Sequence, residues 1–220
     1  MVLTDAQALI AEILQHSNRS HKVSTNRAFL QHLLHNISTL EEIMTIRAYK
    51  GIFPTLGKAV YVDQSAVLVG DIELADDVSI WPLVAARGDV NIMRIGARTN
   101  IQDGSVLHLS RPSPGKPEGS ALIIGEDVTV GHKVMLHGCT LGNRILIGMG
   151  AIVMDDVVVE DDVIIGAGSL VPPGKRLQSG HLYVGSPAKQ ARPLNAAEIA
   201  FLTESAANYV ILKNEYLAEA

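Results

Sequence analysis

The sequence predicts an all-β fold, a single-stranded parallel β-helix built from hexapeptide repeats, and three observations support this prediction. Aliphatic residues recur every six positions over most of the chain, a small or β-branched residue often follows four positions later, and glycines punctuate the repeat. No helix has a period of six and a two-faced strand repeats every two residues, whereas short strands joined by turns at a fixed interval fit a β-solenoid. Three hexapeptides then make one triangular coil of about 18 residues.

The repeat runs from Val62 to Val171, with a slip after Ala86 and a one-residue deletion before Leu141. Valine and isoleucine suit flat strands, and glycine permits tight corners. The aliphatic residues predicted to point inward are Val62, Leu68, Leu74, Ile80, Ala86, Ile95, Ile101, Leu107, Ile124, Val130, Leu136, Leu141, Ile147, Val153, Val159, Ile165 and Val171. The small or β-branched residues four positions later are Ala66, Val78, Val84, Thr99, Ser105, Val128, Val134, Thr140, Ala151, Val157, Val163 and Ser169. Pro172-Pro173-Gly174 is predicted to end the regular pattern.

Composition agrees with a narrow aliphatic interior and excludes several functions. Hydrophobic residues make up 47% of the 220 residues, but aromatic residues only 4%. The net charge of −5 provides no basic surface for nucleic acid. No apolar run approaches the roughly 20 residues that a membrane span needs, and no signal peptide is evident. The lone Cys139 excludes an intrachain disulfide, so we expect a cytoplasmic protein with this thiol packed at a corner.

Three segments are predicted along the chain. Residues 1–43 carry two short amphipathic helical patterns and form an N-terminal extension, either poorly ordered and upstream of the natural start or a helical arm that packs on a neighbour. Residues 44–194 form the β-helix, which the Pro-rich and Gly-rich loop 110–120 interrupts. Residues 195–220 are predicted to form a C-terminal helix that packs on the β-helix. Asn195 and Glu198 have the spacing of a capping box and mark the start of this helix.

Three histidines can be placed from the repeat. His108 and His137 each follow an inward leucine, and their separation of 29 residues becomes 18, one coil, once the 11-residue loop 110–120 is removed. They should therefore stack on one face at the strand spacing of about 4.8 Å. His132 lies two positions after inward Val130, on the preceding side of the triangle, and should point away from the other two.

Neutral imidazole is a favoured zinc ligand, and three protein ligands with one open position are typical of catalytic zinc sites. If the three histidines share one metal, His132 must come from a neighbouring copy, as a cyclic trimer allows. The alternative is three unrelated histidines that form hydrogen bonds at an interface.

Several motifs together resemble the gamma-class carbonic anhydrases, in particular their small bacterial YrdA-like branch. The matching segments are Arg87-Gly88-Asp89, Asn100-Ile101-Gln102-Asp103-Gly104, Leu107-His108 and residues 131–138, within a similarity that covers residues 49–216. The resemblance implies a left-handed β-helix and a homotrimer. It also implies a metal at each subunit interface, Zn2+ or alternatively Fe2+ or Co2+, held by two histidines of one subunit and one of the next.

The resemblance also implies roles for the residues around the metal. Asn100 and Gln102 would orient the metal-bound water or bicarbonate. Arg87 and Asp89 would form an ion pair between subunits, and Asp103 would join that network. Tyr209, on the terminal helix, matches a tyrosine near the site. Acidic residues that transfer protons in well-studied members are replaced here by Val90 and Arg111, and Glu118 is the only carboxylate in the loop.

The leading functional expectation is a lyase that reversibly hydrates CO2 to bicarbonate through a metal-bound hydroxide at trimer interfaces. The missing acids predict slow turnover. Two alternatives stay open: a CoA-dependent acyltransferase or thioesterase of the hexapeptide-repeat class, and a non-catalytic metal-binding trimer. The physiological substrate and the native metal are not determined by the sequence.

Overall fold

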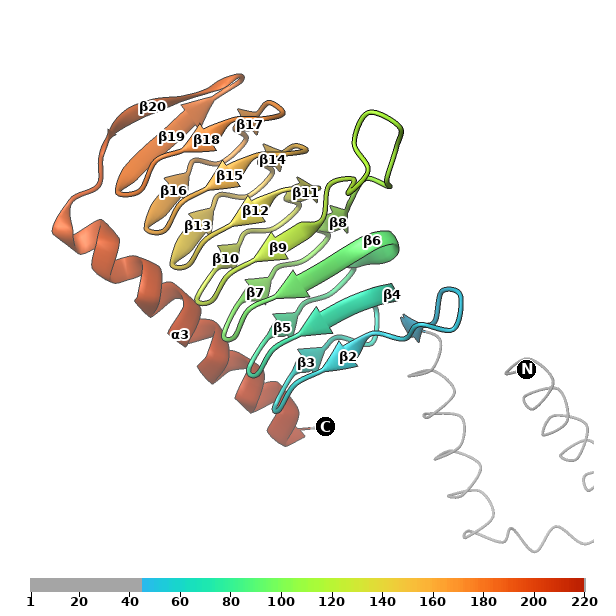
Figure 1. The fold of residues 1–220 in the computed structure, drawn as a ribbon. Coiled ribbons are helices and arrows are strands. Elements are labelled where there is room, and N and C mark those ends of the chain that lie inside the picture. The colour runs from blue at the N-terminus through green and yellow to red at the C-terminus, as the bar shows by residue number, and fades with distance from the viewer. Residues whose placement is uncertain (1–44, 220) are drawn as a thin grey trace, which may run out of the picture. The chain divides into compact units, whose positions relative to one another are not determined.

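The chain winds into a left-handed parallel β-helix that one long helix accompanies along its side (Figure 1). This computed structural model describes residues 45–219, so the extension predicted at residues 1–43 lies outside the described residues. Successive coils pair through parallel strands, as the six-residue period predicts. Each coil contributes a strand to each of three faces, so residues one coil apart become neighbours.

One face, here the helix face, is a continuous sheet of eight strands. Its members are β3 (Tyr61–Val62), β5 (Ser79–Ile80), β7 (Asn100–Ile101), β10 (Thr129–Val130), β13 (Ile145–Ile147), β16 (Val163–Ile165), β19 (His181–Gly185) and β20 (Ala188–Pro193). The last of them, β20, is antiparallel to β19 and ends the solenoid.

The other two faces form one bent sheet, because β4 (Val67–Leu74) and β6 (Ala85–Ile95) are long enough to continue around a corner. The histidine face consists of the first part of β6 with β8 (Val106–His108), β11 (Met135–His137), β14 (Ile152–Val153) and β17 (Leu170–Val171). The third face holds the end of β6 with β9 (Leu122–Ile124), β12 (Thr140–Leu141), β15 (Val158–Val159) and β18 (Arg176–Leu177). At the N-terminal end, β1 (Ile46–Arg47) and β2 (Thr55–Leu56) pair with β4.

The predicted inward residues form one stacked core, against which Val62 packs partly buried. Among the small residues four positions later, Thr140 is exposed, and Cys139 is buried instead. The coil is one residue shorter here, so the inward position moves back by one. Burial raises the pKa of the Cys139 thiol to about 12, which keeps it a neutral packing group.

The prediction that the pattern ends at residues 172–174 is wrong. The prolines occupy a turn, where no ladder N–H is needed. Beyond it, β18 pairs with β15 and β19 pairs with β16, both in parallel. Leu177 and Tyr183, at six-residue intervals after Val171, are buried, so the solenoid extends by two further parallel strands.

Helix α3 (Ala196–Glu219) lies along the helix face and contacts β3, β5 and β10 (Figure 1). The predicted capping box is confirmed: the Glu198 N–H donates to Asn195 Oδ1, and the Asn195 N–H donates to Glu198 Oε2, both at 2.9 Å. Leu202 and Ala206 are buried, whereas Ile199 is exposed. Among the described residues, no helix is both long and apolar enough to span a membrane.

A buried lysine on α3 was not predicted. Lys213 is fully buried, and its Nζ lies 2.8 Å from Asp77 Oδ1 and donates to Asn214 Oδ1 at 2.6 Å. Buried lysines require such partners, because an unpaired charge in the interior is costly. This ion pair therefore fixes the C-terminal half of α3 on the helix face.

Candidate metal centre

His108 and His137 lie side by side on the histidine face. They pair in register between β8 and β11, and their ring centroids are 5.2 Å apart. The predicted stacking one coil apart is therefore confirmed. Both imidazoles are partly buried, so strand register and neighbouring side chains limit their movement.

Each of these imidazoles turns one ring nitrogen toward a carboxylate. His108 Nε2 lies 3.0 Å from Asp89 Oδ1, and His137 Nδ1 lies 2.7 Å from Asp155 Oδ1. Burial raises the pKa of Asp89, but the His108 hydrogen bond and the Arg87 charge outweigh this effect and bring the pKa below its usual value. An ionised carboxylate only accepts hydrogen bonds, so it favours the tautomer with a proton on the ring nitrogen that faces it.

The other two ring nitrogens face each other. His108 Nδ1 and His137 Nε2 are 3.1 Å apart. In the tautomers with a proton on each nitrogen that faces a carboxylate, both inner nitrogens present lone pairs, which repel unless an extra proton or a cation lies between them. A tetrahedral metal with Zn–N bonds of about 2.0–2.1 Å needs ligand nitrogens roughly 3.3 Å apart. The pair therefore fits two positions of such a site, with each imidazole oriented by a carboxylate as zinc-binding histidines commonly are.

The Asp89 carboxylate also joins Arg87, whose guanidinium Nη1 pairs with Asp89 Oδ2. The Arg87 side chain is 51% exposed, so an isolated pair of this kind adds little stability. The structure thus places both residues beside His108 within one chain. The ion pair between subunits, which the resemblance implies for them, stays a prediction.

His132 belongs to a different part of the coil. It follows β10 on the corner after the helix face, where its Nδ1 lies 2.9 Å from Asp103 Oδ2. Both side chains are 47% exposed. The arrangement repeats that of the stacked pair: a carboxylate occupies one ring nitrogen, which leaves Nε2 free for a ligand.

The two predicted amide residues precede Asp103, the partner of His132, along the chain. Gln102 Nε2 donates to Asn100 Oδ1 at 3.1 Å, and Asn100 Nδ2 donates to Thr129 Oγ1 at the same distance. Thr129 Oγ1 lies 2.9 Å from the Ser205 hydroxyl of α3. A buried polar chain therefore connects the helix to the Gln102 amide.

Tyr209 is half-buried on α3 and packs edge-on against Trp81, with 5.6 Å between ring centroids. Burial first, and then the negative charge of Asp103, raise the pKa of its hydroxyl. Tyr209 therefore belongs to the helix face, whereas the stacked pair lies on the histidine face.

The predicted site residues thus separate into two clusters. The paired-histidine cluster consists of Asp89, His108, His137 and Asp155, and the single-histidine cluster consists of Asn100, Gln102, Asp103 and His132. Within residues 45–219 of one chain, no group of three or more His, Cys, Asp or Glu converges to hold a metal ion. A three-histidine site therefore needs the single-histidine cluster of another copy.

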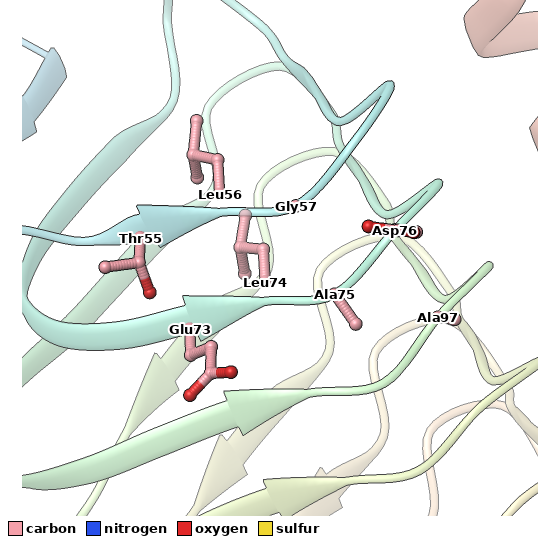
Figure 2. Close-up of a pocket in the computed structure, with 8 residues that line it drawn as sticks. All are labelled: Thr55, Leu56, Gly57, Glu73, Leu74, Ala75, Asp76 and Ala97. Carbon is pink, nitrogen blue, oxygen red and sulfur yellow. The ribbon is translucent and has the colours of Figure 1, made fainter.

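Asp155 was missed from the sequence. Leu136 is in register with Val153, so this coil has only 17 residues and Asp155 lies one position past the register partner of His137, in the turn after β14. A hollow elsewhere on the molecule does not include either cluster. It lies between β2 and β4, where Leu56 and Leu74 are in register and Glu73 lines the same surface (Figure 2).

Comparisons with known proteins identify the fold family. The model of the bacterial transferase hexapeptide (six repeats) matches residues 138–173. Protein YrdA of Escherichia coli strain K12 is 63% identical over 172 residues, which cover 78% of this chain and 94% of that protein. Mitochondrial gamma carbonic anhydrase 1 of Arabidopsis thaliana is 40% identical over 183 residues, covering 81% of this chain and 66% of that protein.

Two solved structures share the architecture. A hexapeptide transferase family protein from Anaplasma phagocytophilum superposes with a TM-score of 0.73 at 38% identity, covering 79% of this chain and 98% of that one. A candidate acetyltransferase from Bacillus cereus superposes with a TM-score of 0.74 at 35% identity, covering 80% of this chain and 98% of that one.

Proposed function

Because the chain belongs to the hexapeptide-repeat family that includes Protein YrdA and the gamma carbonic anhydrases, we propose that it is a metal-dependent enzyme that reversibly hydrates CO2. The site would form between copies in a homotrimer. The observation that carries the proposal is the facing pair of ring nitrogens, His108 Nδ1 and His137 Nε2, 3.1 Å apart. Their outer nitrogens are both occupied by carboxylates, so a cation is the natural occupant of the space between the inner ones.

The surface around the pair supports an interface. Val106, Met135 and Ile152 are aligned across β8, β11 and β14, and each side chain is exposed. Exposed apolar patches of this kind mark contact sites between proteins. A second copy seated on this ladder would bring its own His132 to the paired-histidine cluster, and closed threefold symmetry would create three equivalent sites.

In this arrangement His108, His137 and the neighbour's His132 would hold Zn2+, with Fe2+ or Co2+ as the other candidate metals. Such an ion, when bound, supplies a Lewis acid that lowers the pKa of water from 15.7 to about 7. The chain's own residues do the positioning. Asp89, Asp155 and Asp103 orient the three imidazoles, and Asn100 holds the Gln102 amide, which would bind the reacting water or bicarbonate by hydrogen bonds.

Proton release is the weak point of the proposed reaction. The positions that hold acidic residues in related enzymes are occupied here by Val90, which packs against the core, and by the exposed Arg111. We therefore expect turnover to be limited by proton transfer to the solvent and to rise with the concentration of an imidazole buffer, which replaces the missing acid. Turnover that is independent of buffer concentration would contradict this expectation.

The direct test is stopped-flow CO2 hydration by the full chain loaded with Zn2+, Fe2+ or Co2+. Activity above the buffer rate that a chelator removes would support the proposal. Absence of activity with full metal occupancy would overturn it as a hydratase and leave the metal-binding trimer.

Mixed trimers test whether each site is shared. His132→Ala and His137→Ala chains are each expected to be inactive, because each lacks one ligand at every site. The two chains are unfolded, mixed in equal amounts and refolded together. A trimer that contains both chain types has one interface with all three histidines, so about a quarter of the number of sites in the parent should be restored. No recovery in mixed trimers would contradict a shared site.

The similarity to the Bacillus cereus candidate acetyltransferase gives a second candidate function, CoA-dependent acyl transfer or thioester hydrolysis. The discriminating measurement is calorimetry with CoA. Binding of CoA, with no loss when the metal is removed, would favour acyl transfer over CO2 hydration.

A further inference from the structure

Asp155 connects the paired-histidine cluster to the loop at residues 110–120. Its Oδ1 lies 2.7 Å from His137 Nδ1, and its Oδ2 accepts a hydrogen bond from the Ser110 hydroxyl at 2.9 Å. The side chain is 33% exposed, so the contacts are partly shielded from water. Both oxygens of one carboxylate therefore have a specific partner, one on the candidate metal site and one at the start of the loop.

The backbone next to His137 leaves room for this carboxylate. Gly138 has a φ of 52°, in the left-handed region. A Cβ at this position would lie 2.2 Å from Asp155 Oδ1 and 2.6 Å from the Ser120 Cβ. Any other residue would displace the carboxylate from the imidazole, so this glycine serves the close approach of Asp155 as well as the turn.

The adjacent Asp156 has a different set of partners. Its Oδ1 accepts a hydrogen bond from the Ser120 hydroxyl at 3.0 Å and pairs with the Lys116 ammonium. Ser110 and Ser120 are themselves paired through their backbones at the base of the loop. Both aspartates thus anchor the loop, but Asp155 alone of the two contacts a histidine.

We propose that Asp155 is a positioning residue: it holds His137 as the tautomer protonated at Nδ1, directs Nε2 toward the shared site, and couples that orientation to the loop through Ser110. The importance of this role for metal binding rests on the proposed function. In the other tautomer, Nε2 would carry the proton and His137 would not be a ligand through that nitrogen. Carboxylates that orient ligand histidines typically contribute 10–100-fold to metal affinity.

The first test uses the metal-free full chain, so it does not depend on the proposed function. Nitrogen-15 NMR of histidine-labelled protein at about pH 8.5, above the ordinary imidazole pKa of about 6.5, reports which ring nitrogen carries the proton. We expect His137, assigned by loss of its signals in His137→Gln, to be protonated at Nδ1, and we expect Asp155→Ala to shift it toward Nε2. An Nε2-protonated His137 in the parent, or a tautomer unchanged in Asp155→Ala, would overturn the proposal.

The second test measures Zn2+ affinity by competition with a chromophoric chelator. Asp155→Asn should weaken binding by about 10–100-fold. The matched control Asp156→Asn removes a loop anchor of the same type without touching His137 and should bind as the parent does. Ser110→Ala should fall between them. Equal affinities of Asp155→Asn and the parent, with unchanged circular dichroism, would refute the role of Asp155. A parent that binds no metal would instead refute the proposed function.

Discussion

The paired-histidine and single-histidine clusters contain similar groups but are built differently. His108 and His137 lie on adjacent strands, where the parallel register determines their spacing. His132 lies on a corner, with a half-exposed carboxylate as its partner, and the adjacent amides are held by a buried polar chain that reaches α3. The solenoid alone thus brings two imidazoles together, whereas the amides of the single-histidine cluster are held through contacts with α3, and in the proposed site the third histidine comes from another copy.

The largest expected effect is on the stabilisation of the folded protein by metal. It tests whether the two clusters contribute equally to one site. Saturating metal stabilises the folded state by about 4 kcal/mol at 1,000 times its Kd. Calorimetry with and without chelator should therefore show a metal-dependent rise in Tm for the parent. His132→Ala and His137→Ala should lose this rise to the same extent, although one chain places the two residues in different clusters. A rise retained in His132→Ala would confine the site to the paired-histidine cluster.

Breaking the attachment of α3 should affect mainly the single-histidine cluster. Asp77→Asn leaves the buried Lys213 ammonium without its carboxylate. Such losses cost about 3–5 kcal/mol in the interior, and we expect about 1–3 kcal/mol here because Asp77 is 38% exposed. Urea unfolding measures the change. Lys213→Met is the control, because it removes the charge together with the need for a partner, and it should be less destabilising than Asp77→Asn. A larger loss of stability in Lys213→Met would contradict a structural role for the ion pair.

The sequence predicts those residues whose positions the six-residue repeat determines. A period of six places every inward aliphatic residue, and the coil length predicted that His108 and His137 stack. The same arithmetic does not find Asp155, because the coil after His137 has 17 residues and places Met154 in register with that histidine, with Asp155 in the following turn. The last two parallel strands were missed because Pro172 and Pro173 suggested an end, whereas prolines are acceptable in a turn between strands.

The helix side was less predictable because no repeat relates α3 to the coils. The capping box gave the start of α3, but a lysine has no apolar signal that marks it as buried, and the partner of Lys213, Asp77, is 136 positions away in the chain. The connection from Ser205 through Thr129 to Asn100 also depends on how the helix docks. Such contacts follow from three-dimensional packing rather than from local pattern.

A smaller effect is expected from the polar chain itself. Thr129→Val keeps the side-chain shape but removes the hydroxyl that accepts from Asn100 Nδ2 and contacts Ser205. The loss of a buried hydrogen-bond partner costs about 1–3 kcal/mol, and we expect the lower end because Asn100 Nδ2 also donates to the Val128 carbonyl oxygen. Chemical denaturation gives the stability change. The NMR signals of His108 and His137 should not move; a shift there would mean that the clusters are coupled within one chain.

The smallest effect concerns the start of α3, far from either cluster's histidines, and it depends on pH. The hydrogen bond and charge of Arg192, together with the Asn195 N–H, lower the pKa of Glu198 to about 2, below its ordinary 4.5. A lowered pKa means that the capping carboxylate stabilises the folded state above about pH 4.5 and that this stabilisation is lost as the pH falls through about 2. The Tm of Glu198→Gln should therefore lie slightly below that of the parent at neutral pH and converge with it in acid. A constant difference across this range would show that the carboxylate's charge does not matter. Because the capping box stabilises only the helix, Zn2+ affinity at neutral pH should be the same in both proteins.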